Sequence, residues 1–494
     1  AEQEDSVKNR LISVFHTAIC AAGATNSIYR RAKSDIWLAI PPALCACGME
    51  ISMKYIRKIK TDDGKEHEVY ITRKVNKPVS GTVVVPGSKS MTNRALLLAA
   101  LSKEKSTLRG VLFSDDSRHF LMCLEQLGFA LEIDEENKIV KVQGCGGKIP
   151  NKEAVIDVGS AGTAARFITA MLALSDGKYV INCSEQMKKR PMSELFRILT
   201  EMGASFRYLG EEGYLPVEVS GNGGKCHNID MDISKSTQFL SAMLMVIPVT
   251  STGIDIHIVS EKKDGSYIRI TRNMLKEFGV KTEFDGETYH IDGNQNIHIG
   301  DYYIEPDVSA ACYFYAIAMI TGGSVTVENV HSNSTQGDMK FIKLLEKMDG
   351  KVTDTSKGIN VTGNADGTFS GIDVNMNDFS DQALTLAAMA PFANSETIIR
   401  NVGHIRGQEC NRMSAIVNEL TKCGIRCEEN GDDIHIYPGN VKPALIETYD
   451  DHRVAMAFTM MGLRADGIII DNPMCCRKTF ENYYDVLEKF MNEV

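Results

Sequence analysis

One order of hydrophobic and polar positions recurs along most of the chain: a β-branched run, a short polar loop, then a long apolar stretch. The strand-like runs lie at residues 82–85, 156–158, 231–233, 303–306, 372–374 and 448–449. The apolar stretches after them predict helices at 92–102, 160–174, 236–246, 307–320, 378–390 and 450–463. Short β-branched runs favour strands, whereas apolar stretches of about ten residues or more favour buried helices. The pattern therefore predicts an α/β protein.

The same layout repeats about six times. Segments open near Ser90, Ser160, Ser236, Asp307, Asp381 and Asp451, and most close with an amphipathic stretch and a turn. A spacing of roughly 70 residues suits a whole βαβαββ module and is too long for a solenoid unit. Each helix start presents unpaired backbone N–H groups beside a polar loop. We therefore expect the chemistry of the protein in these loops.

Composition and charge narrow the classes of partner. The chain has 494 residues, 43% of them hydrophobic, and its 64 acidic and 54 basic residues give a formal charge of -10. That balance argues against a broad basic surface for nucleic acid, but it leaves open a cationic pocket for a small anion. The 13 cysteines form no CxxC pair, which favours free thiols of a cytoplasmic protein and no metal site. The uncharged residues 36–49 are too few to span a membrane.

The first polar loop, residues 87–94, combines a helix start with Lys89, Ser90 and Arg94. Such a set suits a phosphate or carboxylate, although a serine N-cap with two solvated cations explains the loop equally well. The second loop, residues 159–166, is built from small residues around Gly162 and would let a ligand approach the backbone. Taken alone, it also reads as a flexible turn.

Three cations in the second half of the chain are more informative. Arg412, Arg453 and Lys478 each lie in or beside a boundary between repeats. Independent surface charges have no reason to concentrate there, so a shared anion pocket explains their placement better.

In order and spacing, these motifs resemble the 5-enolpyruvylshikimate-3-phosphate synthase family over about residues 72–490. The matching segments are Pro86-Gly87-Ser88-Lys89-Ser90 with Asn93-Arg94, Ala161-Gly162-Thr163-Ala164 with Arg166, Arg190-Pro191-Met192, Ser236-Thr237-Gln238-Phe239-Leu240, and Asp450-Asp451-His452-Arg453. Each segment is a modest signal, but the ordered set is specific.

The resemblance implies an α/β (α+β) fold: a two-domain inside-out α/β barrel of six βαβαββ repeats, three in each domain. It divides the chain into an extension of unknown role (1–70), an N-terminal domain (88–306) and a C-terminal domain (71–87 plus 307–494). The chain would cross between domains twice, so the strand around residues 70–85 would join the C-terminal domain.

The family's activity is the transfer of the enolpyruvyl group of phosphoenolpyruvate to the 5-hydroxyl of shikimate 3-phosphate, with release of phosphate, in the shikimate pathway. The resemblance implies addition followed by elimination without a metal or organic cofactor, in a cytoplasmic monomer that binds neither nucleic acid nor membrane. Inhibition by glyphosate, a mimic of phosphoenolpyruvate, is expected because Gly162 leaves room for it.

The family's residue roles carry over by position. The groups expected to bind shikimate 3-phosphate are Lys89, Ser90, Arg94, Ser236, Thr237, Gln238, Tyr267, Asp307 and Gln408. Those expected to bind phosphoenolpyruvate are Lys89, Gly162, Arg190, Gln238, Arg412, Arg453 and Lys478, with Ser160 and Arg166 in the same motif. The expected catalytic residues are Asp307 beside the hydroxyl, Glu409 beside the methylene carbon, and Lys89.

Two departures from the family pattern keep alternatives open. Gln408 and Asn411 stand where the family usually has lysine and aspartate. Loss of the cation at Gln408 would lower activity or shift its work to Lys89. A UDP-N-acetylglucosamine enolpyruvyl transferase and a catalytically impaired relative that only binds ligands are the competing hypotheses.

Overall fold

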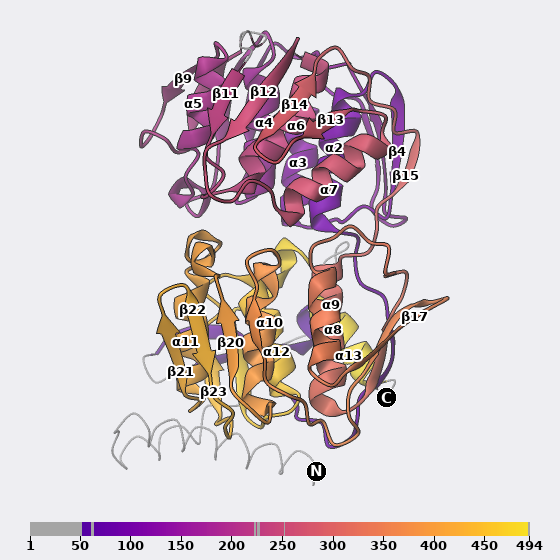
Figure 1. Cartoon of the computed structure of the whole chain (residues 1–494), viewed down its shortest axis with the longest axis vertical. Helices are drawn as coiled ribbons and strands as arrows, with labels where there is room; N and C mark the ends of the chain where they lie inside the picture. The colour runs from indigo at the N-terminus through magenta and orange to yellow at the C-terminus, as the bar shows by residue number, and fades with distance from the viewer. Residues whose placement is uncertain (1–51, 61–63, 222–223, 225–227, 251, 493–494) are drawn as a thin grey trace.

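The computed structural model describes residues 52–60, 64–221, 224, 228–250 and 252–492. It shows two lobes, one above the other, joined at a narrow waist (Figure 1). Residues 1–51 of the expected extension lie outside the described residues.

The upper lobe contains three four-stranded sheets among the described residues, in the following orders. The first is β15 (Asp301–Tyr303), β4 (Lys105–Arg109), β6 (Ile139–Gln143), β5 (Leu131–Asp134); the second is β7 (Glu153–Asp157), β8 (Lys178–Asn182), β10 (Val217–Ser220), β9 (Ser205–Tyr208). The third is β11 (Asn228–Met231), β12 (Gly253–Ile258), β14 (Thr288–Asp292), β13 (Thr282–Phe284). Its helices are α2 (Lys89–Leu101), α3 (Asp115–Gln126), α4 (Gly162–Ala173), α5 (Ser193–Glu201), α6 (Thr237–Thr250) and α7 (Ser266–Glu277).

The lower lobe repeats this plan. Its sheets are β17 (Lys351–Thr355), β18 (Gly358–Thr362), β16 (Ser324–Val327), β3 (Ser80–Val83); then β19 (Asp373–Asn375), β20 (Thr397–Arg400), β22 (Asp433–Ile436), β21 (Cys427–Asn430); then β1 (Ile56–Lys60), β2 (Glu66–Ile71), β24 (Ile468–Asp471), β23 (Ala444–Ile446). Its α-helices are α8 (Val308–Thr321), α9 (Met339–Lys347), α10 (Ala383–Met389), α11 (Arg412–Lys422), α12 (His452–Gly462) and α13 (Tyr483–Asn492). Two short 3-10 helices face the other lobe, η3 (Ser380–Gln382) and η6 (Pro473–Lys478).

The expected inside-out arrangement is confirmed. In each lobe one set of helices is buried on nearly every side, namely α2, α4 and α6 above and α8, α10 and α12 below. Their sequences are apolar all round, which is the composition of a helix surrounded by protein. The helices α3, α5, α7, α9, α11 and α13 alternate with them in sequence and are buried on one face only. The sheets close the outside of both lobes.

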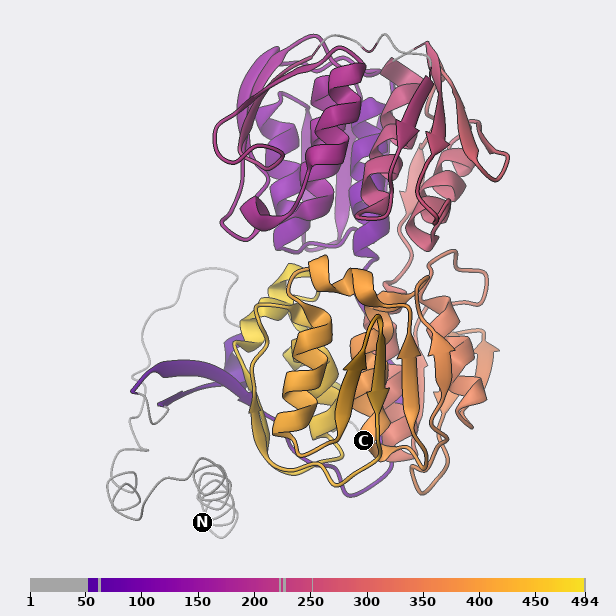
Figure 2. The same cartoon turned by 60° about the vertical axis from the view of Figure 1, so that its left-hand side comes forward.

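Three repeats are completed by strands from elsewhere in the chain. β15 pairs in parallel with β4, and β3 pairs in parallel with β16. The hairpin β1–β2 completes the sixth sheet, since β2 pairs antiparallel with β24 (Figure 2). Residues 56–60 and 66–70, assigned from the sequence to an extension outside the repeats, thus belong to the lower lobe. Their closely spaced charges masked the strand pattern, although Val69 and Tyr70 are buried.

The two chain crossings run side by side at the waist. The Ser88 N–H donates to the carbonyl of Glu305 at 2.8 Å, and the Asp307 N–H donates to the carbonyl of Pro86 at 2.8 Å. A Cβ on Gly87 would lie 1.9 Å from the carbonyl oxygen of Gly110, so only glycine fits there. The crossings therefore place the starts of α2 and α8 opposite one another.

Candidate active site

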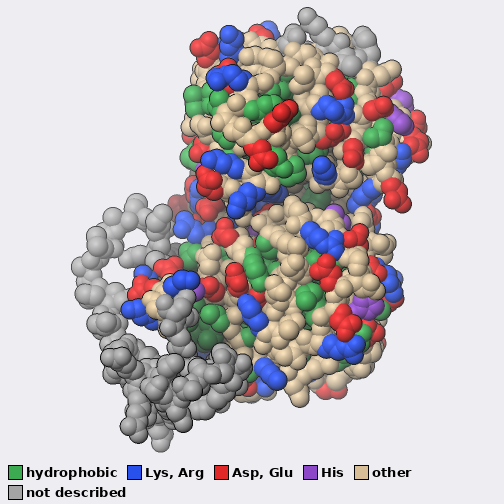
Figure 3. Space-filling view, turned by 90° about the vertical axis from the view of Figure 1, so that its left-hand side faces the viewer, with side chains coloured by type: hydrophobic (Ala, Val, Ile, Leu, Met, Phe, Trp, Pro, Cys, Tyr) green, Lys and Arg blue, Asp and Glu red, His purple; other side chains and the backbone are tan. Residues whose placement is uncertain are grey.

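A cleft of about 1040 Å³ separates the two lobes. The beginnings of α2, α4 and α6 line it from above, and those of α8, η3 and α12 line it from below. Lysine and arginine side chains, with carboxylates among them, gather where the lobes meet (Figure 3). Helix N-termini carry partial positive charge and free N–H donors, so this cleft is suited to anions.

The cleft collects nearly all the residues singled out in the sequence. Those lining it are Lys89, Ser90, Arg94, Gly162, Arg166, Arg190, Ser236, Thr237, Gln238, Tyr267, Asp307, Gln408, Glu409, Arg412 and Arg453. Lys478 lies beside it: its ammonium group donates to Gln186 Oε1 at 2.9 Å, and Gln186 donates to the carbonyl of Glu409 at 3.4 Å. These two contacts join the lobes. Ser160 does not line the cleft, although its neighbour Gly162 does.

The upper lobe contributes buried cations without anionic partners. Among the described residues, no carboxylate lies within ion-pair distance of Arg94, Arg166 or Arg190. Arg94 donates instead to Thr271, Ser90, Ser241 and Tyr267 at 2.7–3.3 Å, and Arg166 donates to Gln238 Oε1 at 2.6 Å. Burial lowers the pKa of Arg94 to about 10 and, with Arg190, that of Arg166 to about 9. Buried charges of one sign are costly, so a bound anion would stabilise this set.

Gly162 brings the backbone close to one of these cations. A Cβ at this position would lie 2.5 Å from Nη1 of Arg190. The glycine at the start of α4 therefore lets the guanidinium lie against the backbone.

The lower lobe holds its cations in an ion-pair network centred on Arg412. This buried guanidinium donates to Asp451 at 2.8 Å, Asp381 at 2.9 Å and Glu409 at 2.8 Å. Arg453 donates to Asp381 at 3.0 Å. Asp381 and Glu409 therefore lie within reach of one guanidinium.

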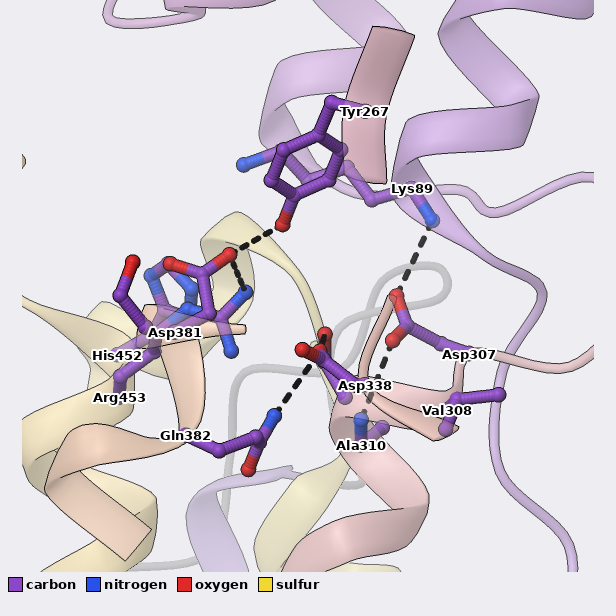
Figure 4. Close-up of polar contacts among 12 residues, drawn as sticks. Lys89, Tyr267, Asp307, Val308, Ala310, Asp338, Asp381, Gln382, His452 and Arg453 are labelled. Carbon is purple, nitrogen blue, oxygen red and sulfur yellow. Dashed lines mark hydrogen bonds and ion pairs between the residues drawn. The ribbon is translucent and has the colours of Figure 1, made fainter. Parts of the chain in front are cut away.

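Asp381 also contacts the upper lobe, since the Tyr267 hydroxyl donates to its Oδ2 (Figure 4). Burial raises the pKa of Asp381, but Arg453 and Arg412 outweigh burial and leave it below its ordinary value. Burial likewise opposes ionisation of Glu409, yet Arg412, Arg190, Lys478 and Lys89 hold its pKa well below the ordinary value. Both carboxylates are ionised at neutral pH when no ligand is bound.

Asp307 has a different environment. One oxygen accepts the N–H of Ala310 at 3.2 Å, which caps α8, and the other accepts the N–H of Lys89 at 3.1 Å. The Lys89 ammonium group pairs with Asp116 at 2.8 Å. Both oxygens of Asp307 are thus engaged by backbone donors, which ties the starts of α2 and α8 together.

Asp381 was not among the site residues inferred from the sequence, although it opens a repeat in the same way as Asp307. That shared position at the start of a repeat was the signal in the sequence that could have marked Asp381 as a site residue. Asp307, Asp381 and Asp451 all precede an inner helix, but Asp307 and Asp451 accept backbone N–H groups as helix caps. Asp307 and Asp381 both line the cleft, but only Asp381 of the three lies there between two arginines, and only the structure shows this.

The two departures from the family pattern have separate surroundings. Asn411 caps α11, because its side chain accepts the N–H of Ser414 at 3.2 Å. Gln408 lines the cleft next to Glu409. His404 exchanges a hydrogen bond with Ser380 at 2.7 Å, and burial and Lys262 lower its pKa.

The described part of the chain offers neither a membrane-spanning helix nor a metal cluster. No helix in it is both long and apolar enough to cross a membrane. No group of three or more His, Cys, Asp or Glu side chains in it is arranged to hold a metal ion.

Comparison with known proteins gives one consistent result. Residues 74–487 match the family described as EPSP synthase (3-phosphoshikimate 1-carboxyvinyltransferase). A relative of that name from Trichormus variabilis is 42% identical over 420 residues, covering 85% of this chain and 98% of the relative. One from Photorhabdus laumondii is 40% identical over 417 residues, covering 83% and 96%. A solved structure of EPSP synthase from Acinetobacter baumannii matches with a TM-score of 0.71 and 25% identity, covering 85% of this chain and 97% of that one.

Proposed function

The chain belongs to the EPSP synthase family, and on that premise we propose that its cleft transfers the enolpyruvyl group of phosphoenolpyruvate to the 5-hydroxyl of shikimate 3-phosphate and releases phosphate. The observation that carries the proposal is the convergence of six helix starts and the cations around Glu409 on one cleft. Each substrate is a small acid with one phosphate and one carboxylate, which suits that arrangement.

The residues that line the cleft fall into two sets, and we propose that each set binds one of the two substrates. Arg94, with Ser90, Ser236 and Thr237, would bind the anionic groups and hydroxyls of shikimate 3-phosphate. Lys89, Arg190, Arg412, Arg453 and Lys478 surround Glu409 and Asp381 and would bind phosphoenolpyruvate. Because both lobes supply the phosphoenolpyruvate set, binding of this substrate favours closure, which excludes water and strengthens every charge interaction.

The chemistry needs a group on each side of the reacting carbon. The hydroxyl must lose a proton as its oxygen attacks C2 of phosphoenolpyruvate, while the methylene carbon gains one; phosphate then leaves and that proton is removed again. We propose Asp381, rather than Asp307, as the acceptor of the hydroxyl proton. Asp381 contacts side chains of both lobes, Tyr267 above and Arg412 below, at the place where the substrates would meet. Asp307 instead holds backbone N–H groups at the starts of α2 and α8.

Glu409 is the proposed carrier of the methylene proton. In the ligand-free cleft the surrounding cations keep the pKa of this carboxyl low. The charges of phosphoenolpyruvate would offset those cations and raise its pKa, so the substrate itself would ready Glu409 to hold a proton.

A phosphate-release assay tests the proposed function. Turnover with phosphoenolpyruvate and shikimate 3-phosphate is expected. Turnover only with UDP-N-acetylglucosamine as acceptor would favour the related transferase. Tight binding of shikimate 3-phosphate without turnover would identify a catalytically impaired relative.

Gly162→Ala is expected to raise the KM for phosphoenolpyruvate by about tenfold, because the new methyl group would displace the Arg190 guanidinium and weaken a charge-assisted hydrogen bond. Inhibition by glyphosate should weaken in parallel. Steady-state kinetics with each substrate varied in turn would measure both effects. An unchanged KM for phosphoenolpyruvate would show that Arg190 does not contribute to binding this substrate.

Gln408→Lys is expected to raise kcat/KM for shikimate 3-phosphate by about tenfold, because it adds a cation beside Glu409 in the cleft. The same assay measures it, with Asn411→Asp as the matched control at the other departure. Because Asn411 serves as the cap of α11, aspartate there should change the rate little. A Gln408→Lys enzyme no faster than wild type would contradict this expectation and would indicate that Lys89 already does the work of the missing lysine.

We further propose that the protein acts in the cytoplasm as a monomer and without nucleic-acid or membrane partners. The nine cysteines in the described part of the chain are all free thiols, which supports the cytoplasmic location.

A further inference from the structure

A second buried carboxylate, Asp338, lies beside Asp381 in the lower lobe (Figure 4). It precedes α9, lines the cleft and is only 6% exposed. Its Oδ2 accepts hydrogen bonds from the Ser309 hydroxyl and from the Gln382 amide, the latter at 3.0 Å. Both donors are uncharged, in contrast to the two arginines that hold Asp381.

Gln382 connects the two carboxylates through the backbone. It follows Asp381 directly within η3 and is completely buried. Its amide oxygen accepts a hydrogen bond from the Thr385 hydroxyl at 2.9 Å, so both ends of the side-chain amide are held. The bond from Gln382 to Asp338 thus anchors the turn that presents Asp381 to the cleft.

The groups that face Asp338 come from four elements. Asp381 lies on η3, Arg453 on α12, Tyr267 on α7 and Cys312 on α8. Arg453 donates to Asp381, and no cation among the described residues lies within ion-pair distance of Asp338. Two neighbouring carboxylates in a buried site do not both ionise readily. Burial and Asp381 raise the pKa of Asp338 to about 6. Below that pH, Asp338 is therefore the carboxyl of the two that keeps a proton.

We propose that Asp338 is a positioning residue for the hydroxyl base: through Gln382 it fixes the turn that carries Asp381, and its own proton controls how strongly Asp381 attracts one. The inference rests on the proposed function. When Asp338 is neutral, Asp381 is a weak base between two arginines. When Asp338 ionises, a second negative charge beside Asp381 makes that carboxylate a stronger base. The rate should therefore rise as Asp338 loses its proton.

Asp338→Asn separates charge from geometry. The amide oxygen of asparagine accepts from Ser309 and Gln382 as the acid does, but the side chain stays neutral at every pH. We expect kcat at pH 7.5 to fall about tenfold with KM values within twofold of wild type, and the inflection near pH 6 in the kcat profile to disappear. Ser309→Ala is the matched control: its hydrogen bond lowers the pKa of Asp338, so the inflection should move to higher pH.

A second readout needs no substrate. The folded chain holds the Asp338 proton more tightly than the unfolded chain, whose ordinary pKa is 3.8, so wild type loses stability as pH rises from about 4 to 6. The Asp338→Asn protein lacks this loss. Its Tm should exceed that of wild type at pH 7.5, and the difference should shrink toward pH 4.5.

The outcomes separate this inference from the proposed function. If wild type fails to turn over shikimate 3-phosphate, the function is refuted, and the melting comparison alone decides whether Asp338 holds a proton. If wild type is active, but the Asp338→Asn pH profile superimposes on it or the Tm difference is the same at both pH values, the inference about Asp338 is overturned.

Discussion

Asp381→Asn is expected to lower kcat by about a thousandfold while leaving the protein folded. Removing a general base typically costs between a hundredfold and ten-thousandfold in rate. Asparagine keeps the size of the side chain and an oxygen for the Tyr267 hydroxyl, but it cannot take a proton from the substrate. Arg412 retains Asp451 and Glu409 as partners, so the network around it persists. Steady-state kinetics and a thermal melt would measure the two effects.

Asp307→Asn provides the matched control, since it makes the same chemical change at the corresponding position of the neighbouring repeat. Asparagine is as good an N-cap as aspartate, so α8 should keep its start, and we expect kcat to fall no more than about tenfold. The two variants decide between the carboxylates. A larger loss in Asp307→Asn than in Asp381→Asn would restore the assignment made from the sequence.

Arg412→Met is expected to give the largest loss of stability, about 3–5 kcal/mol, because removing one partner from a buried ion pair leaves uncompensated charge. Asp451 is completely buried and would lose its arginine, while Asp381 and Glu409 would each lose one hydrogen bond. The two side chains are similar in volume, so lost packing contributes little. Urea unfolding, with hydrogen exchange of α12 to isolate the lower lobe, would measure the change.

The stability lost in Arg412→Met should depend on pH in a defined direction. Arg412 lowers the pKa values of Asp381 and Glu409, so without it these two pKa values rise. Protonation of the two carboxyls then relieves the uncompensated charge, and the difference in stability from wild type should shrink as pH falls from 8 toward 5. Arg400→Met is the control, because Arg400 also pairs with two carboxylates, Asp373 and Asp433, but at the partly exposed surface. It should cost far less stability than Arg412→Met, because exposed ion pairs contribute little. Equal losses in the two variants would show that burial of the network is unimportant.

The repeat pattern predicted the inner helices well because each follows a polar loop and is apolar all round. The helix expected at 160–174 is observed at Gly162–Ala173, and that expected at 307–320 at Val308–Thr321. β1 and β2 escaped prediction because a charged edge hairpin lacks the apolar alternation by which strands are recognised, and its partner β24 lies about 400 residues away in the chain.

The carboxylate that we propose as the hydroxyl base was harder to predict than the cations. A buried arginine at a helix start has few roles other than binding an anion, whereas an aspartate there is most often a cap. Asp307, Asp381 and Asp451 are alike in sequence position, and their roles separate only through contacts made by distant residues such as Tyr267 and Arg412. Asp338 illustrates the same limit, because its unusual proton affinity depends on Asp381, which lies in another repeat.

The central claim is that helix starts from both lobes bind two anionic substrates in one cleft. A crystal structure with shikimate 3-phosphate and glyphosate bound tests it most directly. We expect the 5-hydroxyl within hydrogen-bond distance of Asp381, and glyphosate held by Lys89 and Arg190 from one lobe and by Arg412 and Arg453 from the other. Ligands bound to a single lobe, or a 5-hydroxyl directed away from Asp381 toward Asp307, would contradict it.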